Sequence, residues 1–142
     1  MSRRYAREAA FKTLFQKEQG GIELDKALNF CFDELDLSDN DKTFARMLVE
    51  GTLSNLNNID EVVSKFLVNW ELKRLATVDR AVLRLAIYEL LYQTDIPSAV
   101  TINEAIEITK KYQDEESAAF VNGLLDKITK DIPAGIKSGE SI

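Results

Sequence analysis

Apolar side chains recur at intervals of three and four residues along most of this chain, which is the spacing of one face of an α-helix. The first such stripe comprises Ala6, Ala10, Phe11, Leu14 and Phe15, and similar stripes follow as far as about residue 130. Alternation of apolar and polar residues, which marks a half-buried strand, nowhere extends beyond a few residues. The pattern predicts seven helices, at residues 4–19, 24–35, 39–56, 59–69, 77–92, 102–112 and 115–130.

Residues that commonly begin or end helices stand between these stripes. Glycine and asparagine interrupt a helix, whereas serine, threonine and aspartate accept hydrogen bonds from the free N–H groups of its first turn. The predicted signals are Gly20-Gly21 after the first helix, Ser38 before the third, Asn57-Asn58 after the third, Thr101 with Glu104 as a capping box before the sixth, and Asp114 before the last.

The stretch 77–92 is apolar on almost every side, and such a helix is normally covered by neighbours. We therefore expect an all-α fold in which about seven helices form two packed subdomains of a single domain, residues 1–132. The N-terminal subdomain should span about 1–57 and the C-terminal one about 58–132. Pro133, Gly135 and Gly139 predict a flexible tail over 133–142.

Composition narrows the functional classes. The chain has no histidine and one cysteine, Cys31, which excludes histidine-based catalysis, histidine-containing metal sites and an intrachain disulfide. Phosphate-binding glycine motifs are absent too, so neither an enzymatic role nor a cofactor or metal is expected. Neither a signal peptide nor a membrane helix is recognisable, and a cytoplasmic protein without membrane contact is predicted.

Charge is distributed unevenly. The net charge is −6, but residues 1–17 carry five basic residues against one acid, whereas residues 18–61 carry eleven acids against three bases. Arg3 and Arg7 lie four residues apart, on one face of the first helix, and guanidinium groups bind phosphates in a bidentate manner. The basic segment predicts a local anionic partner, with a solvated chain start as the plain structural alternative.

A second candidate site lies between residues 110 and 123. Two lysines precede Tyr112, and Phe120 follows on the next helix, so this junction could offer bases a stacking platform beside phosphate contacts. The competing interpretation is that both aromatics belong to the core. Gly123 inside a helix permits close approach of another backbone, either from the fold or from a partner. Asp79 falls in a helical first turn, where the helix dipole alone can explain it.

Several segments together resemble the NusB family of bacterial transcription antitermination factors. The segments are Arg3-Arg4-Tyr5-Ala6-Arg7-Glu8-Ala9-Ala10, the stretch from Trp70 to Leu90, Asp95-Ile96-Pro97, Thr101-Ile102-Asn103-Glu104-Ala105-Ile106-Glu107, and Phe120-Val121-Asn122-Gly123-Leu124-Leu125-Asp126. The resemblance extends from Arg3 to about Ile132 and is weakest across residues 20–40.

This resemblance implies an all-α fold and binding to the boxA element of nascent ribosomal RNA. It also implies a heterodimer with NusE, a small-subunit ribosomal protein, and loading onto the RNA polymerase elongation complex with other Nus factors, which suppresses termination. By the same resemblance, the RNA-binding positions are Arg3, Arg4, Arg7, Tyr112, Glu116 and Phe120. Asp79 matches an acidic position on the NusE-facing side.

The chain departs from the family pattern at Tyr5, where relatives often have arginine, and at Gln113, where glycine is frequent. Glu116 would repel phosphate or accept a hydrogen bond from a base amino group. Two alternatives are kept beside the RNA-binding role. One is a protein–protein adaptor or homodimer that uses Arg7 and Phe120. The other is an accessory domain of an RNA methyltransferase, which would require a catalytic half beyond this chain.

Overall fold

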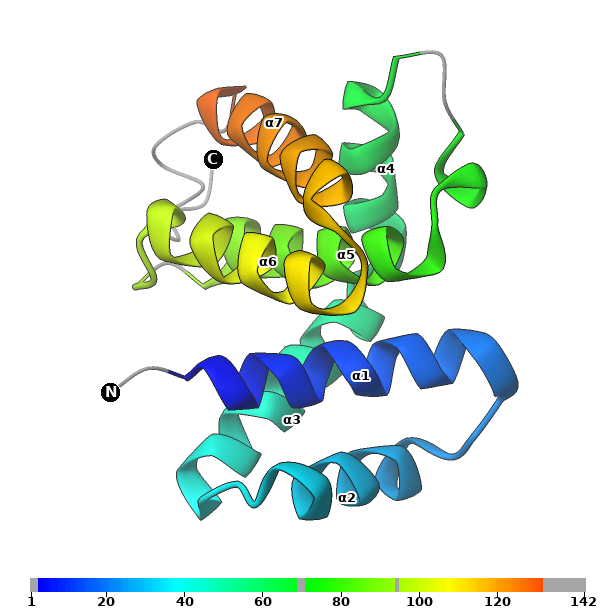
Figure 1. The fold of residues 1–142 in the computed structure, drawn as a ribbon, viewed down its shortest axis with the longest axis vertical. Helices are drawn as coiled ribbons and strands as arrows, with labels where there is room; N and C mark the ends of the chain where they lie inside the picture. Colours follow the sequence, from blue (N-terminus) through cyan, green and yellow to red (C-terminus); the bar gives the residue numbers. More distant parts are fainter. Residues whose placement is uncertain (1–2, 69–70, 94, 132–142) are drawn as a thin grey trace. The chain divides into compact units, whose positions relative to one another are not determined.

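The computed structural model describes residues 3–68, 71–93 and 95–131, and within these ranges it contains helices and no strand. The predicted all-α class is therefore confirmed (Figure 1). The elements are α1 (Arg4–Gly20), α2 (Leu24–Leu35), α3 (Asp39–Ser54), α4 (Leu56–Phe66), the 3-10 helix η1 (Leu72–Arg74), α5 (Thr77–Tyr92), α6 (Ser98–Tyr112) and α7 (Glu115–Asp131).

The chain divides into two compact units between Ser54 and Asn55. Unit 1 ends with α3 and unit 2 begins just before α4, so the boundary lies three residues before the one expected near residue 57. The tail predicted over 133–142 lies outside the described residues. No helix in the described part of the chain combines the length and the apolar character that crossing a membrane requires.

Unit 1 is built on α1, which packs against both α2 and α3 (Figure 1). Four of the five residues in the apolar stripe of α1 are buried as its spacing predicted, Phe11 and Leu14 among them, and Phe15 is half-buried. From α2, Leu28 and Cys31 are fully buried. Burial raises the pKa of the Cys31 thiol, against a smaller lowering by its hydrogen bond with Thr13. This cysteine is therefore a protonated core residue rather than a reactive thiolate.

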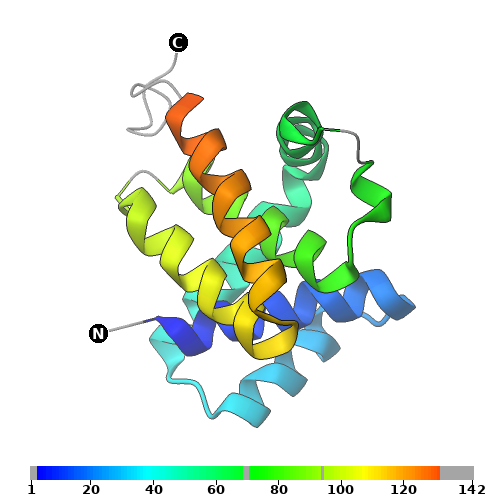
Figure 2. The ribbon, with the colours of Figure 1, turned by 45° about the horizontal axis from the view of Figure 1, so that its top comes forward.

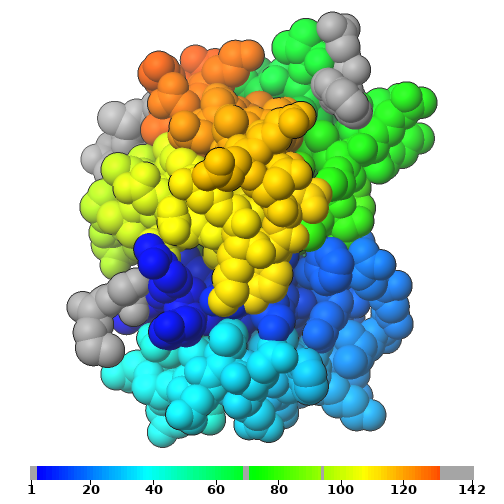
Figure 3. All heavy atoms as spheres, viewed as in Figure 1, coloured from blue at the N-terminus to red at the C-terminus, as the bar shows by residue number. Residues whose placement is uncertain are grey.

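Unit 2 is organised around α5, which packs against α4, α6 and α7. Ten residues of α5 are buried, including its full run from Leu85 to Leu90, as the all-round apolar pattern predicted. Figure 2 shows α6 and α7 side by side, and Figure 3 shows their side chains in contact over the visible face of this unit. Only residues 113–114 connect these two helices, so they follow each other in the sequence and also pack against each other.

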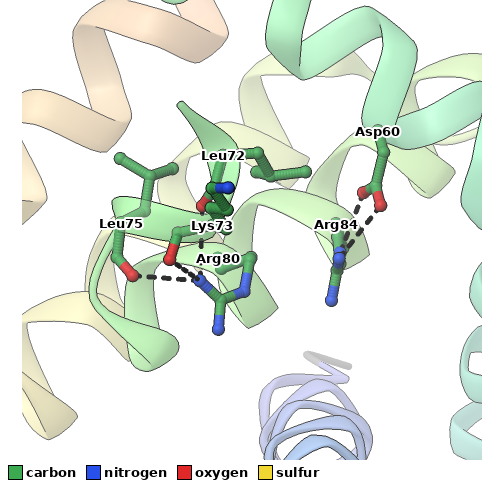
Figure 4. Close-up of polar contacts among 6 residues, drawn as sticks. All are labelled: Asp60, Leu72, Lys73, Leu75, Arg80 and Arg84. Atoms are coloured by element: carbon green, nitrogen blue, oxygen red, sulfur yellow. Dashed lines mark hydrogen bonds and ion pairs between the residues drawn. The ribbon is translucent and has the colours of Figure 1, made fainter. Parts of the chain in front are cut away.

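Two arginines of α5 hold neighbouring segments in place (Figure 4). Arg84 donates two hydrogen bonds to the carboxylate of Asp60, both 2.9 Å long, and so joins α5 to α4. One terminal nitrogen of Arg80 lies within 3.0–3.3 Å of the carbonyl oxygens of Leu72, Lys73 and Leu75, which fixes η1 against the start of α5. The helix η1 was not predicted, because three residues are too few to show a periodic pattern.

We expect Asp60→Asn to lower the free energy of unfolding by about 1–3 kcal/mol, because it leaves a partly buried guanidinium without its carboxylate. The side chains of Arg84 and Asp60 are 18% and 27% exposed. Urea denaturation followed by circular dichroism measures the effect. Asp25→Asn is the matched control, since Asp25 pairs with Arg46 at 65% exposure and should change stability by less than about 1 kcal/mol. Equal losses in the two variants would contradict the prediction.

Most of the predicted helix ends are confirmed. Gly21 adopts the left-handed conformation (φ 63°) that ends α1. The hydroxyl of Ser38 accepts the N–H of Asp41 at 3.2 Å, and the carboxylate of Asp114 accepts the N–H of Ser117 at 2.7 Å. Both are side-chain caps of the kind that stabilises a first turn.

Two predicted helix starts are wrong. The break between α3 and α4 falls at Asn55, so Asn57 and Asn58 lie in the first turn of α4 instead of separating the helices. Helix α6 begins at Ser98, directly after the extended Pro97, and Thr101 therefore lies inside it. The Thr101 hydroxyl donates to the buried carboxylate of Glu89 at 3.0 Å instead of capping the helix. A buried carboxylate needs such a donor, and this tertiary demand outweighs the local capping pattern.

Candidate nucleic-acid interface

Helix α1 starts with an unusual charge arrangement. Arg3 is its N-cap residue and makes no side-chain capping bond, and its first turn contains no acid. The first N–H groups of a helix have no partner within the helix, and the helix dipole places partial positive charge there. Arg3 and Arg4 add two guanidinium groups to this end, where the dipole favours acids instead. The arrangement is unfavourable for the isolated helix and favourable for binding an anion.

The three predicted arginines differ in exposure. Arg3 and Arg4 are exposed, whereas Arg7 is 5% exposed. The guanidinium carbon of Arg3 lies 4.2 Å from the centre of the Phe44 ring, and that of Arg7 lies 5.4 Å from the same centre. Phe44 comes from α3 and is itself buried. In the sequence, Phe44 stands out only as one apolar residue of its helix.

The junction between α6 and α7 contains the second candidate region. Tyr112 is the last residue of α6 and is half-buried, with the ammonium group of Lys111 located 5.5 Å from its ring centre. Gln113 follows at a φ of −132°, outside the left-handed region, so glycine is not required there by the backbone. Asp114 then caps α7. The aromatic ring and the lysine are therefore adjacent at the end of one helix.

A pocket of about 300 Å³ brings together three predicted residues that are far apart in sequence. Asp79 of α5 and Glu116 and Phe120 of α7 all line it. The remaining lining residues are Arg74, Leu75, Ala76 and Ser117. The family resemblance assigns Asp79 to a protein partner and the other two to RNA, and no sequence pattern places them in one pocket. Arg74 and Ser117 were missed because neither belongs to a recognisable motif.

Asp79 supplies the buried carboxylate of this pocket. Asp79 is only 7% exposed, and its Oδ1 has no hydrogen-bond partner among the described residues. Burial raises the pKa of Asp79, the nearby charge of Asp114 raises it further, and a hydrogen bond with Ser117 lowers it. A buried oxygen without a donor costs free energy, so this atom is prepared to accept a hydrogen bond from an incoming group.

A larger groove, of about 470 Å³, also has Phe120 in its lining. It is lined by Phe66, Leu67, Val68, Ala119, Phe120, Gly123, Leu124 and Lys127. Phe120 is 36% exposed and Val68 is 68% exposed, so the interpretation of Phe120 as a core residue is wrong. Phe120 therefore lines both the pocket that contains Asp79 and Glu116 and the apolar groove.

Gly123 is not required by packing within the described residues. A Cβ atom built on it would meet nothing within 4 Å. We expect Gly123→Ala to raise the free energy of unfolding by about 0.5–1 kcal/mol, because alanine has the higher helix propensity. Thermal and urea denaturation measure this difference. Destabilisation would show that a neighbouring group occupies the space beside Gly123. A variant that is more stable but binds its partner more weakly would show that the partner's backbone approaches Gly123 in the groove.

The arginines belong to unit 1, whereas Asp79, Tyr112, Glu116 and Phe120 belong to unit 2. Each region is therefore a candidate interface in its own right. Chemically, the first offers guanidinium groups and helix N–H groups to anions, and the second offers aromatic faces and carboxylate acceptors. Three or more residues of the kinds that hold metal ions do not gather anywhere among the described residues.

Comparison with known proteins gives a consistent result. The NusB family model matches residues 4–130. The transcription antitermination protein NusB of Desulfitobacterium hafniense is 48% identical over 134 residues, which cover 93% of this chain and 90% of the relative. NusB of Bacillus subtilis is 46% identical, covering 93% of this chain and 98% of the relative.

Solved structures agree with the sequence relatives. The structure of T. maritima NusB has a TM-score of 0.84 and 48% identity, and the match covers 92% of each chain. A chain in a crystal structure of antitermination factors NusB and NusE in complex with dsRNA has a TM-score of 0.84 and 27% identity, covering 92% of this chain and 97% of that one. A family model matched over nearly the whole chain, together with relatives close to half identical, shows that this chain belongs to the NusB family.

Proposed function

We propose that this protein is a transcription antitermination factor that binds the boxA element of nascent ribosomal RNA together with NusE. In this role it joins the RNA polymerase elongation complex with other Nus factors in the cytoplasm and helps the polymerase read through terminators. Family membership supports the proposal, as does the similarity to the chain solved with NusE and dsRNA. The observation that carries the RNA role is the exposed pair Arg3 and Arg4 at the positive end of α1.

The two candidate regions would contact different parts of the RNA. Arg3 and Arg4 contact phosphates, which supply affinity with little sequence information. Tyr112 and Phe120 stack on unpaired bases, and base-edge contacts near Glu116 provide selectivity. Arg7 is buried beside Phe44, so we expect it to act by supporting the exposed arginines more than by a phosphate contact of its own.

Asp79 would contact NusE from the α5 side of the pocket, whereas Glu116 and Phe120 on α7 would contact the RNA. The unpartnered Oδ1 of Asp79 suits a hydrogen-bond donor from a protein, whereas the carboxylates of Asp79, Asp114 and Glu116 disfavour the close approach of a phosphate. A bound NusE would then supply further contacts to the same RNA. This arrangement predicts modest RNA affinity for the chain alone and higher affinity for the heterodimer.

The deciding experiment compares a boxA-containing RNA with a scrambled RNA of equal length, each with and without purified NusE. We expect selective binding of the boxA RNA that NusE strengthens. Equal binding of both RNAs, or none, would favour a protein–protein adaptor or a homodimer that uses the exposed surface around Phe120. Sedimentation at several protein concentrations in the same buffer identifies self-association.

A further inference from the structure

Two guanidinium groups of α1 lie against one aromatic ring of α3. The carbon atoms at their centres are 4.2 Å (Arg3) and 5.4 Å (Arg7) from the centre of the Phe44 ring. Both distances are within the range of a cation–π interaction, in which the negative face of the ring attracts the cation. All three residues belong to unit 1, so the arrangement does not depend on unit 2.

The ring of Phe44 offsets part of the electrostatic repulsion at the start of α1. Like charges approach one another at the start of α1, and the helix dipole adds further positive potential there. A buried aliphatic side chain in place of Phe44 would fill the same volume without attracting either guanidinium. The aromatic face contributes attraction for both cations, and it is supplied from a different helix.

Stacking leaves the arginine able to bind. A guanidinium group is planar, and its five N–H donors point outward in that plane. A guanidinium group that contacts a ring through its face therefore keeps these donors available to phosphate oxygens. Arg3 is exposed, so its donors can reach a ligand while the ring limits the conformations of its long side chain. Fewer conformations have to be lost when RNA binds, which raises affinity.

We propose that Phe44 is a positioning residue of the RNA site, which holds the guanidinium group of Arg3 in a conformation ready for phosphate, with Arg7 supporting the same ring. The inference rests on the proposed RNA-binding function, because it assigns how one of the phosphate contacts is prepared. Packing alone requires only a large apolar residue at position 44, whereas this role requires an aromatic one.

The test is a double-mutant cycle measured by RNA binding, with Phe44→Leu, Arg3→Ala and the double variant. We expect Phe44→Leu to weaken binding of boxA RNA about fivefold, the size of an exposed cation–π contact. In the Arg3→Ala background the same change should have less than about half of that effect. Phe44→Tyr keeps the aromatic face and should bind RNA as the unmodified chain does. Urea denaturation shows that each variant is folded under the binding conditions.

Arg3→Lys keeps the inference testable if Phe44→Leu does not fold. Lysine retains the positive charge at an exposed position but lacks both the planar group that stacks and the bidentate phosphate contact, so binding should fall about fivefold or more. Equal binding by Arg3→Lys and the unmodified chain would overturn the inference. So would a Phe44→Leu effect that is as large in the Arg3→Ala background as in the parent.

Failure of the proposed function has a different signature. If the unmodified chain does not bind boxA RNA even with NusE, the function and the positioning role are both overturned. If it binds selectively but Phe44→Leu binds equally well, only the positioning role is overturned. NMR of the free protein provides an additional readout, because stacking should shift the side-chain resonances of Arg3 upfield, and Phe44→Leu should abolish that ring-current shift.

Discussion

Asp79→Asn is expected to make the protein more stable at neutral pH and, at the same time, a poorer partner for NusE. Burial and the charge of Asp114 both raise the pKa of Asp79, and one carboxylate oxygen has no donor. The folded state therefore holds a carboxylate that would be better solvated in the unfolded chain. An uncharged amide of the same shape relieves that conflict, and we expect a gain of about 1 kcal/mol in the free energy of unfolding.

The pH dependence follows from the direction of the shift. The unfolded chain releases the Asp79 proton near the ordinary value of 3.8, whereas the folded protein releases it at higher pH. Between these two values the folded state binds more protons than the unfolded state, so the contribution of Asp79 to stability falls as pH rises through this window. The advantage of the asparagine variant should therefore be small below about pH 4 and reach its full size at neutral pH.

Loss of NusE binding should be the larger of the two effects. If a donor from NusE enters the pocket, removing the charge from its buried acceptor weakens that contact by about 2 kcal/mol, or roughly 30-fold in Kd. Calorimetric titration of NusE into each protein, beside urea denaturation near pH 4 and pH 7, measures both effects. Asp126→Asn, an exposed change on α7, is the control for loss of one negative charge. Unchanged NusE affinity in Asp79→Asn would remove this pocket from the interface.

The helical framework could be predicted from the sequence because it depends on local information. The stripe of α1, the stop at Gly21 and the caps at Ser38 and Asp114 all act within a few residues, and each is confirmed. The start of α6 was predicted wrongly because the Thr101 hydroxyl serves a buried carboxylate, Glu89, that lies on another helix. A local pattern carries no information about such a distant requirement.

The candidate sites likewise combine features that are local in the sequence with contacts between different helices. Family resemblance identified Asp79 and Phe120 individually, but only the packing of α5 against α7 places them around one pocket. Phe44 carried no sequence signal of its own, because an aromatic residue in an apolar stripe is what a core position requires. Its relation to Arg3 depends on how α1 packs against α3. Residues that act through another helix are therefore the ones that sequence reasoning misses.

Replacing both Arg3 and Arg4 with alanine should reduce RNA affinity strongly and should change its salt dependence. If each exposed arginine neutralises one phosphate of a single strand, together they contribute about −1.4 to the slope of log K against log salt concentration. The loss of that contribution corresponds to about a 25-fold weaker affinity in 0.1 M salt. Arg7, which is buried, should affect this slope less than either exposed arginine.

Urea denaturation checks the fold of the double variant, because the change removes both the unfavourable positive charge at the start of α1, worth about 0.3–1 kcal/mol, and the contact of Arg3 with the Phe44 ring. Titrations of boxA RNA between about 50 and 200 mM salt give the slope. The matched control combines Lys26→Ala with Lys73→Ala, since both lysines are exposed and the total charge lost is the same. A similar loss of RNA affinity in this control would show that the total charge of the chain, and not the position of the two arginines, explains the weaker binding. A parent slope near zero would remove phosphate contact from the mechanism and leave the start of α1 without an anionic ligand.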